Sequence, residues 1–135
     1  MEKLLRIFIF AFPFFYLAGC QPDLKISKFD IDWNDDVKKV NARIKNTGGE
    51  GTGPFTVNIN AIEEPTSINH RPVITKEIPN LGKNDYIDIN ADFAPLAHPD
   101  NADLKNVKKI QIVVDPTGMV KESNKNNNTE EKSVP

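Results

Sequence analysis

Residues 55–61 read Phe-Thr-Val-Asn-Ile-Asn-Ala, and apolar and polar side chains alternate along them without a break. Successive side chains of a β-strand point to opposite faces of its sheet, so this pattern predicts a strand with one buried face and one polar face. The glycine-rich stretch before it, residues 47–54, predicts a loop that needs positive backbone angles. The buried face of the strand is expected to carry Phe55, Val57, Ile59 and Ala61.

The same period of two recurs on both sides of this stretch, and no segment shows a sustained helical period of 3.6. In the first alternating segment the apolar phase changes near Ser27-Lys28, which predicts a bulge or a strand that changes sheets. A helical turn is conceivable only in the connection at residues 94–106, after Pro99. Further strands are predicted at residues 23–33, 36–46, 73–78, 86–93, 110–114 and 129–134.

About seven short strands with turn signals every 8 to 15 residues predict an all-β fold, a sandwich of two antiparallel sheets. A parallel α/β sheet is disfavoured because its strands are buried on both faces and lack the polar face seen here. The chain has one cysteine, so no disulfide bond can form within it. Its stability must therefore come from an aliphatic core.

The start of the chain has the pattern of an export signal. Lys3 and Arg6 precede an apolar run at residues 7–18, which ends at Leu17-Ala18-Gly19-Cys20. At about 12 residues, this run is too short to cross a bilayer core that needs about 20. The pattern resembles a bacterial lipobox, in which the cysteine thiol is acylated and the chain is cut before it. The alternative is an ordinary signal peptide that ends in a chance cysteine.

On the lipobox interpretation, residues 1–19 are a lipoprotein signal peptide, residues 20–22 a lipidated tether and residues 23–135 a single domain. Two or three acyl chains would make attachment to the membrane essentially permanent. The expected location is the bacterial cell envelope. Gln21 stands where an aspartate usually retains lipoproteins in the inner membrane, so the outer membrane is favoured if the cell has two membranes.

The charge balance argues against nucleic acid as a partner. The chain has 17 basic and 19 acidic side chains, and removing Glu2, Lys3 and Arg6 with the signal leaves 15 and 18. Binding to phosphate backbones is driven by clustered lysine and arginine, which this slightly acidic domain does not offer.

Residues 115–129 read Asp-Pro-Thr-Gly-Met-Val-Lys-Glu-Ser-Asn-Lys-Asn-Asn-Asn-Thr. This run resembles the hairpin signature of the CARDB family, the cell-adhesion-related domain found in bacteria. The resemblance implies an immunoglobulin-like or fibronectin-III-like sandwich and a role in binding. The family often has an acidic residue where Lys125 stands, and residues 63–71 look like an insertion. Further pieces in the family's order are Pro22-Asp23-Leu24, Asn46 to Gly48, Gly53 to Val57 and Ile78 to Gly82.

The polar side chains of this hairpin are predicted to be structural, because short Asp, Asn and Ser side chains bond to backbone N–H groups outside a sheet. The alternative is a calcium site at Asp115, Glu122 and Asn124, whose hard oxygens suit that ion. Lys125 weighs against it, and we expect no metal. The structural hairpin residues are Asp115, Gly118, Glu122, Asn124, Asn127 and Asn128.

Other residues that often carry chemistry have simpler interpretations here. Trp33, in phase with apolar neighbours, is expected in the core or at its edge, although a ligand-stacking role stays open. His70 and His98 have no second ligand at a metal-binding spacing. The carboxylate pairs Asp35-Asp36 and Glu63-Glu64 are expected in solvated turns, because acid–base catalysis needs carboxyl groups facing each other across a cleft. No cofactor motif or nucleophile motif is present.

The sequence therefore predicts a lipid-anchored envelope protein that is not an enzyme and needs no cofactor. Its expected function is to bind an envelope protein or a surface polysaccharide, with the membrane as a second partner through the lipid. The alternative is a structural or assembly accessory of a membrane-associated complex. A sandwich fold hosts many functions, so the fold does not choose between them.

Overall fold

The computed structural model describes residues 20–63, 73–96 and 104–135. Within these ranges the chain forms seven strands and two short 3-10 turns, Ala94–Leu96 and Leu104–Asn106, which confirms the all-β fold. Neither turn is long or apolar enough to cross a membrane. The strands are β1 (Leu24–Trp33), β2 (Lys38–Asn46), β3 (Phe55–Glu63), β4 (Val73–Ile78), β5 (Tyr86–Asp92), β6 (Val107–Val114) and β7 (Thr129–Ser133).

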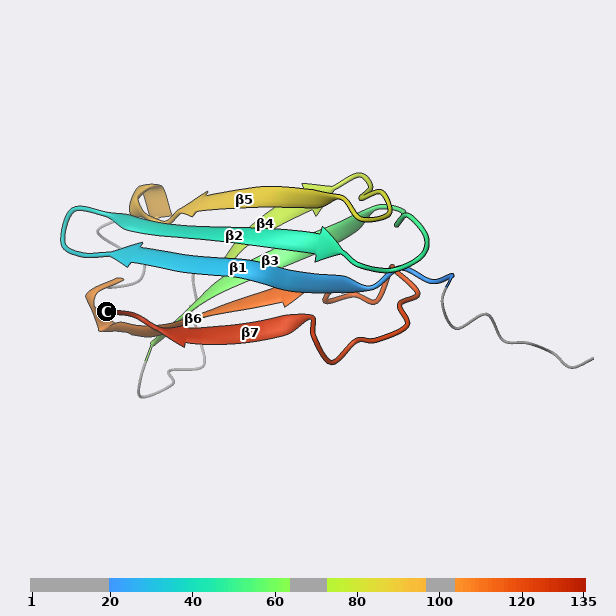
Figure 1. Ribbon diagram of the computed structural model, residues 1–135. Helices are drawn as coiled ribbons and strands as arrows, with labels where there is room; N and C mark the ends of the chain where they lie inside the picture. The colour runs from blue at the N-terminus through green and yellow to red at the C-terminus, as the bar shows by residue number, and fades with distance from the viewer. Residues whose placement is uncertain (1–19, 64–72, 97–103) are drawn as a thin grey trace, which may run out of the picture.

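The strands form two sheets that lie one over the other as the layers of a sandwich (Figure 1). The three-stranded sheet has the order β1-β2-β5, and the four-stranded sheet has the order β4-β3-β6-β7. Every pairing is antiparallel. This arrangement confirms the predicted sandwich of two antiparallel sheets.

The alternation at residues 55–61 positions β3 as the sequence predicts. Phe55 is 2% exposed, while Val57, Ile59 and Ala61 are fully buried. β3 pairs with β4 on one side and with β6 on the other, so its apolar face lies in the middle of the four-stranded sheet. That face belongs to one core cluster that also includes Val40, Ile44 and Ile89 of the opposing sheet. Each large aliphatic side chain buried in this way stabilises the fold by about 1.5–3 kcal/mol.

β1 contains the irregularity predicted near Ser27-Lys28. The register of the β1–β2 pair shifts between Ile26 and Lys28, and the buried phase changes there from Leu24 to Phe29. β1 pairs with β2 on both sides of the shift, so the irregularity is a bulge and β1 does not change sheets.

Trp33 lies at the edge of the core, as predicted. Its side chain is 9% exposed, and its ring centroid lies 5.5 Å from that of Phe93 at a tilt of 56°. Lys38 places its ammonium group 5.7 Å from the Trp33 ring centroid, which covers the indole further. The ring therefore packs against the core.

Two expectations need correction. β6 begins at Val107 and not at Ile110. The successive residues Lys108 and Lys109 interrupt the alternation, and a shift in the β3–β6 register opposite Ile62 and Glu63 allows the pairing to continue past them. The loop at residues 47–54 has no residue with positive φ, and Gly118 is the only such glycine in the described ranges. Close backbone packing, described below, explains why Gly48 is required in that loop.

The two ends of the sandwich differ. Four segments gather where the chain enters the domain, at the end where the blue strand β1 begins in Figure 1. We call this the entry end, and it consists of residues 20–23, 46–54, 79–85 and 115–128. The opposite end carries the exposed turn at residues 34–37 and the C-terminus. The predicted signal peptide, His70, His98, Glu64 and nearly all of the predicted insertion lie outside the described residues.

Candidate functional site

Asp115 shapes the start of the hairpin that was expected to carry polar structural residues. It follows β6 directly, has a positive φ of 49° and is 6% exposed. Its carboxylate accepts hydrogen bonds from the backbone N–H groups of Met119 and Val120, at 2.8 and 2.9 Å. Gly118, with φ of 69°, allows the chain to turn back over the carboxylate.

Glu122 joins this hairpin to the first strand. The residue is 9% exposed, and its two carboxylate oxygens accept hydrogen bonds from the Leu24 backbone N–H at 2.9 Å and from the Asn128 amide at 2.5 Å. Burial raises the pKa of Glu122, with a smaller contribution from the carboxylates of Asp115 and Asp23, although both hydrogen bonds oppose the rise. The two residues joined at Leu24 and Glu122 are 98 positions apart in the chain.

The asparagines of the hairpin occupy different environments. Asn127 donates from its amide to the Asp23 carboxylate at 2.9 Å. The exposed Asn124 accepts a hydrogen bond from the backbone of Asn126 at 2.9 Å. The side-chain oxygens Oδ1 of Asn127 and of Asn128 are buried and have no hydrogen-bond partner.

Asn46 is the polar residue whose importance the sequence did not reveal. It is fully buried at the end of β2, and its Oδ1 accepts hydrogen bonds from the backbone of Asp23 and Gly48. Its amide donates to the carbonyls of Glu50, Leu81 and Gly82, at 2.7, 3.2 and 3.2 Å. The available signal was an asparagine at the last inward position of an alternating strand, directly before a glycine loop. One side chain thus holds three segments of the entry end together.

Residues 21 and 22, expected as part of a tether, are hydrogen-bonded to the domain. The Gln21 carbonyl accepts from Gly49 at 3.0 Å, the Pro22 carbonyl accepts from Ser123 at 3.1 Å, and Pro22 is buried. A Cβ atom on Gly48 would lie 2.1 Å from the Gln21 carbonyl oxygen, so only glycine fits there. Cys20, exposed, is the residue directly before this fixed segment.

The residues considered for calcium use their oxygens within the chain. Asp115, Glu122 and Asn124 all accept hydrogen bonds from backbone or amide groups, as described above. In the described part of the chain, no group of three or more His, Cys, Asp and Glu residues could hold a metal ion. The arrangement suits a structural role for the hairpin.

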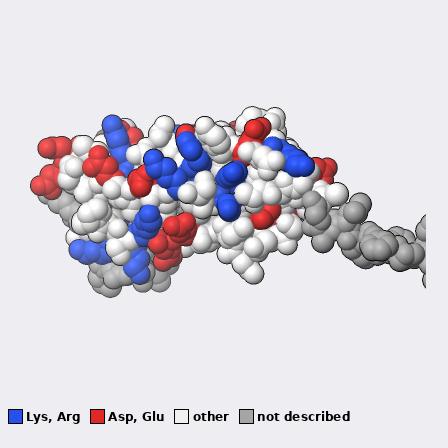
Figure 2. Space-filling view, in the orientation of Figure 1, with Lys and Arg blue, Asp and Glu red and all other residues white. Residues whose placement is uncertain are grey.

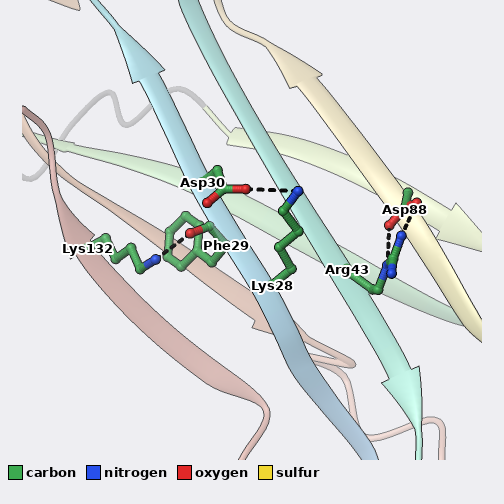
Figure 3. Close-up of polar contacts among 6 residues, drawn as sticks. All are labelled: Lys28, Phe29, Asp30, Arg43, Asp88 and Lys132. Atoms are coloured by element: carbon green, nitrogen blue, oxygen red, sulfur yellow. Dashed lines mark hydrogen bonds and ion pairs between the residues drawn. The ribbon is translucent and has the colours of Figure 1, made fainter.

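The outer face of the three-stranded sheet is an exposed polar surface with ordered side chains. Arg43 of β2 donates to both carboxylate oxygens of Asp88 on β5, at 2.7 and 2.8 Å (Figure 3). Its guanidinium also stacks on the ring of Tyr86, 3.9 Å from the centroid, and Tyr86 is 55% exposed. The hydrogen bonds from Arg43 lower the pKa of the Asp88 carboxyl. We call this surface the sheet face, and its central side chains are those of Lys28, Asp30, Lys39, Asn41, Arg43, Tyr86, Asp88, Asn90 and Asp92.

The sheet face mixes charges of both signs. Basic and acidic side chains are intermixed over it in Figure 2. The Lys28 ammonium nitrogen lies 3.2 Å from a carboxylate oxygen of Asp30. Beside them is a shallow hollow of about 240 Å³ lined by Lys39, Asn41, Asn90, Ala91 and Asp92. These groups donate and accept hydrogen bonds in a flat array. Such an array suits recognition of a polar partner.

One edge of the sandwich is closed by a side chain. Lys132 of β7 reaches across to the carbonyl oxygen of Phe29 on β1 and lies over the Phe29 ring, 5.1 Å from its centroid (Figure 3). β1 is the outer strand of its sheet, with unpaired backbone groups along that side. The lysine therefore covers part of an edge that could pair with another chain.

A comparison with protein-family models matches the CARDB model to residues 21–132. Among solved structures, the CARDB domain of a Pyrococcus furiosus protein, described as in complex with di-metal ions, is similar at 20% identity. The match covers 84% of this chain and 87% of that one, with a TM-score of 0.51.

A GH3 beta-glucosidase from Bifidobacterium adolescentis is also similar in structure, at 12% identity and a TM-score of 0.51. The match covers 84% of this chain but 17% of the enzyme. At these identities the likeness shows the fold alone. No curated protein sequence matches the chain.

Proposed function

The chain belongs to the CARDB family, whose members are non-catalytic binding domains, and from that premise we propose that it binds an envelope partner through the sheet face. In this proposal, a lipid on Cys20 displays the protein in the bacterial cell envelope. The partner is a protein or a surface polysaccharide. A binding module needs an exposed surface that is already ordered before the partner arrives. The sheet face meets that requirement.

The observation that carries the proposal is the group formed by Arg43, Asp88 and Tyr86. Two hydrogen bonds and a stacked ring fix the guanidinium, so little side-chain entropy remains to be lost on binding. Tyrosine and arginine are also the residue types that contribute most to binding energy at interfaces. The neighbouring hollow adds hydrogen-bonding groups of Asn41 and Asn90.

The lipid anchor is supported by the lipobox pattern and by the place of Cys20. It is exposed and lies one residue before Gln21, where the chain becomes fixed to the domain. We expect Cys20→Ser to release the protein from the membrane fraction or to leave it uncleaved. Full processing together with unchanged membrane retention would disprove lipid attachment at this residue.

Partner binding is tested by crosslinking in intact envelopes with a photoreactive residue at position 41 or 90, followed by recovery of the lipidated protein. We expect crosslinked material from both positions, and we expect it to be lost in Arg43→Ala and Tyr86→Ala. Lys108→Ala, on the exposed face of β6 in the other sheet, is the matched control and should leave it unchanged. Equal yields in all three variants would reject the sheet face as the binding surface.

A further inference from the structure

The entry end carries an exposed apolar side chain beside a hollow. Met119, in the β6–β7 hairpin, is 66% exposed. It borders an open hollow of about 400 Å³ that is lined by the starting residues of β3, the end of β4 and the following proline. The lining residues are Pro54, Phe55, Thr56, Glu77, Ile78, Pro79 and Met119.

The same hairpin exposes only positive charge. Its two carboxylates, Asp115 and Glu122, are 6% and 9% exposed and accept hydrogen bonds inside the hairpin and from β1. The remaining charged residues of the hairpin, Lys121 and Lys125, are exposed. Lys125 extends back over the turn, with its ammonium nitrogen 3.6 Å from the position that a Cβ atom on Gly118 would take. Two cationic groups therefore follow the exposed methionine in sequence, two and six positions after it.

The attachment point of the proposed lipid lies at this end. Gln21 and Pro22 are held by hydrogen bonds to Gly49 and Ser123, so no free linker separates the domain from Cys20. Ser123 belongs to the same hairpin as Met119. A lipid on Cys20 would therefore bring the entry end to the surface of the bilayer.

We propose that the β6–β7 hairpin at the entry end contacts the bilayer surface, with Met119 in the headgroup region and Lys121 and Lys125 facing anionic lipid headgroups. The inference rests on the proposed lipid on Cys20. An exposed apolar side chain with lysines close to it in the same hairpin suits the interface of an anionic membrane. The contact orients the sandwich on its end and leaves the sheet face accessible from the side.

The other charges of the entry end make this contact specific to the hairpin. Lys83, Asp85 and Glu50 are exposed on the neighbouring loops and together carry a net charge of −1, so these loops add no attraction to an anionic surface. The opposite end exposes Asp35 and Asp36, which an anionic surface would repel. Among the described segments of the two ends, the hairpin at residues 115–128 exposes charges that are all positive.

The experiment uses the lipidated protein in vesicles that contain phosphatidylglycerol. The chain has one cysteine, and lipid would block it, so Met119→Cys supplies a single free thiol for an environment-sensitive dye. Asp36→Cys, exposed at the opposite end, is the matched control. We expect a blue-shifted emission and several-fold stronger quenching by headgroup-labelled lipid at position 119 than at position 36.

A charge-reversed variant tests the lysines. Lys121→Glu combined with Lys125→Glu should reduce the quenching at position 119 and leave the thermal melt unchanged, because both side chains are exposed. Neutral vesicles and high salt should reduce it in the same way. Loss of quenching together with a lowered melting temperature would instead make the lysines structural and overturn their assignment to lipid.

The outcomes separate the two proposals. Protein that floats with the vesicles but shows equal quenching at positions 119 and 36 keeps the anchor and overturns the membrane contact. Protein that does not float removes the anchor, and the contact falls with it. Strong quenching at 119 that is indifferent to the charge-reversed pair would keep the methionine contact and reject the role of the lysines.

Discussion

Asn46 and Gly48 decide how the first strand is attached to the rest of the domain. The amide of Asn46 satisfies five backbone groups from three segments, and Gly48 lies so close to residues 21–23 that a side chain has no room. Buried backbone groups that lose their partners cost about 1–3 kcal/mol each. The polar residues of the entry end therefore stabilise the attachment of residues 21–23 to the domain. These residues directly follow Cys20, the proposed site of the lipid.

We expect Gly48→Ala to destabilise the domain by about 1–3 kcal/mol or more, because the new methyl group must displace Gln21 and Asp23. Gly53→Ala is the control in the same loop, since no atom lies within 4 Å of its Cβ position, and its effect should stay within about 0.5 kcal/mol. Urea denaturation measures both. Equal midpoints would mean that the strand start is not fixed against the loop.

Glu122 gives the fold a predictable dependence on pH. Its pKa is raised in the folded protein mainly by burial, so the folded state binds the proton more tightly than the unfolded state does. The stabilisation from this proton is complete below the usual Glu value of 4.5 and is lost as the pH rises through the folded pKa. In Glu122→Gln this loss is absent, and the Asn128 amide can turn its unpaired oxygen toward the new amide group.

The free energy of unfolding of Glu122→Gln, minus that of the natural protein, should therefore increase as the pH rises from about 4.5 to 7. Chemical denaturation at a series of pH values measures the difference. A variant that becomes relatively weaker as the pH rises would show that the folded state uses the negative charge.

At the scale of the elements, the period of two decides which face of each strand enters the core. β6 illustrates this, because Ile110 and Ile112 are fully buried while Lys108 is exposed. The alternation is interrupted at the bulge in β1 and again at the start of β6, where Lys108 and Lys109 follow each other and the register shifts against β3. The hydrophobic pattern thus fixes the register wherever it is continuous.

Ile112→Asp should unfold the domain, because an unpaired buried carboxylate costs several kcal/mol, comparable to the stability of a whole domain. Lys108→Glu should leave the melting temperature nearly unchanged, since its side chain faces water. Thermal melts followed by circular dichroism test the pair. Similar melting temperatures for the two variants would contradict the strand orientation.

At the scale of the whole molecule, the sandwich joins its first and last segments directly. Glu122 bonds to the first residue of β1, Asn127 bonds to Asp23, and Lys132 closes the edge beside Phe29. These contacts link positions about one hundred residues apart. The hairpin therefore connects the first segment of the domain to the last one. Calcium binding at the hairpin would stabilise the entire fold.

We expect no change in melting temperature beyond about a degree or two between millimolar calcium and EDTA, because the candidate oxygens already accept hydrogen bonds. Calcium at about one hundred times its dissociation constant would instead stabilise the fold by roughly 2.7 kcal/mol. That corresponds to a rise of roughly 10 °C. Such a rise, absent in Glu122→Gln, would establish a metal site and make the unpaired oxygens of Asn127 and Asn128 candidate ligands.

The sequence by itself determined the all-β class, the inward phase of the strands and the place of the irregularity in β1, which the structure then showed to be a bulge. These properties depend on neighbours within one strand, where the alternation of side chains is strict and each apolar residue has one buried face to occupy. The resemblance to the CARDB family likewise depends on short continuous runs, chiefly residues 115–129. Local patterns were sufficient for all of these.

Only the tertiary structure decided that Asn46 joins three segments, that Gly48 packs against residues 21–23 and that Arg43 meets Asp88 and Tyr86. The partners in these contacts are distant in the sequence, and each pairing depends on which strands become neighbours and in what register. The hydrophobic period of a sequence does not show which distant residues will contact each other, because the chemistry of a side chain does not specify the residue that will face it. The fold class followed from local alternation, whereas the candidate site exists only because long-range pairing brings separate segments together.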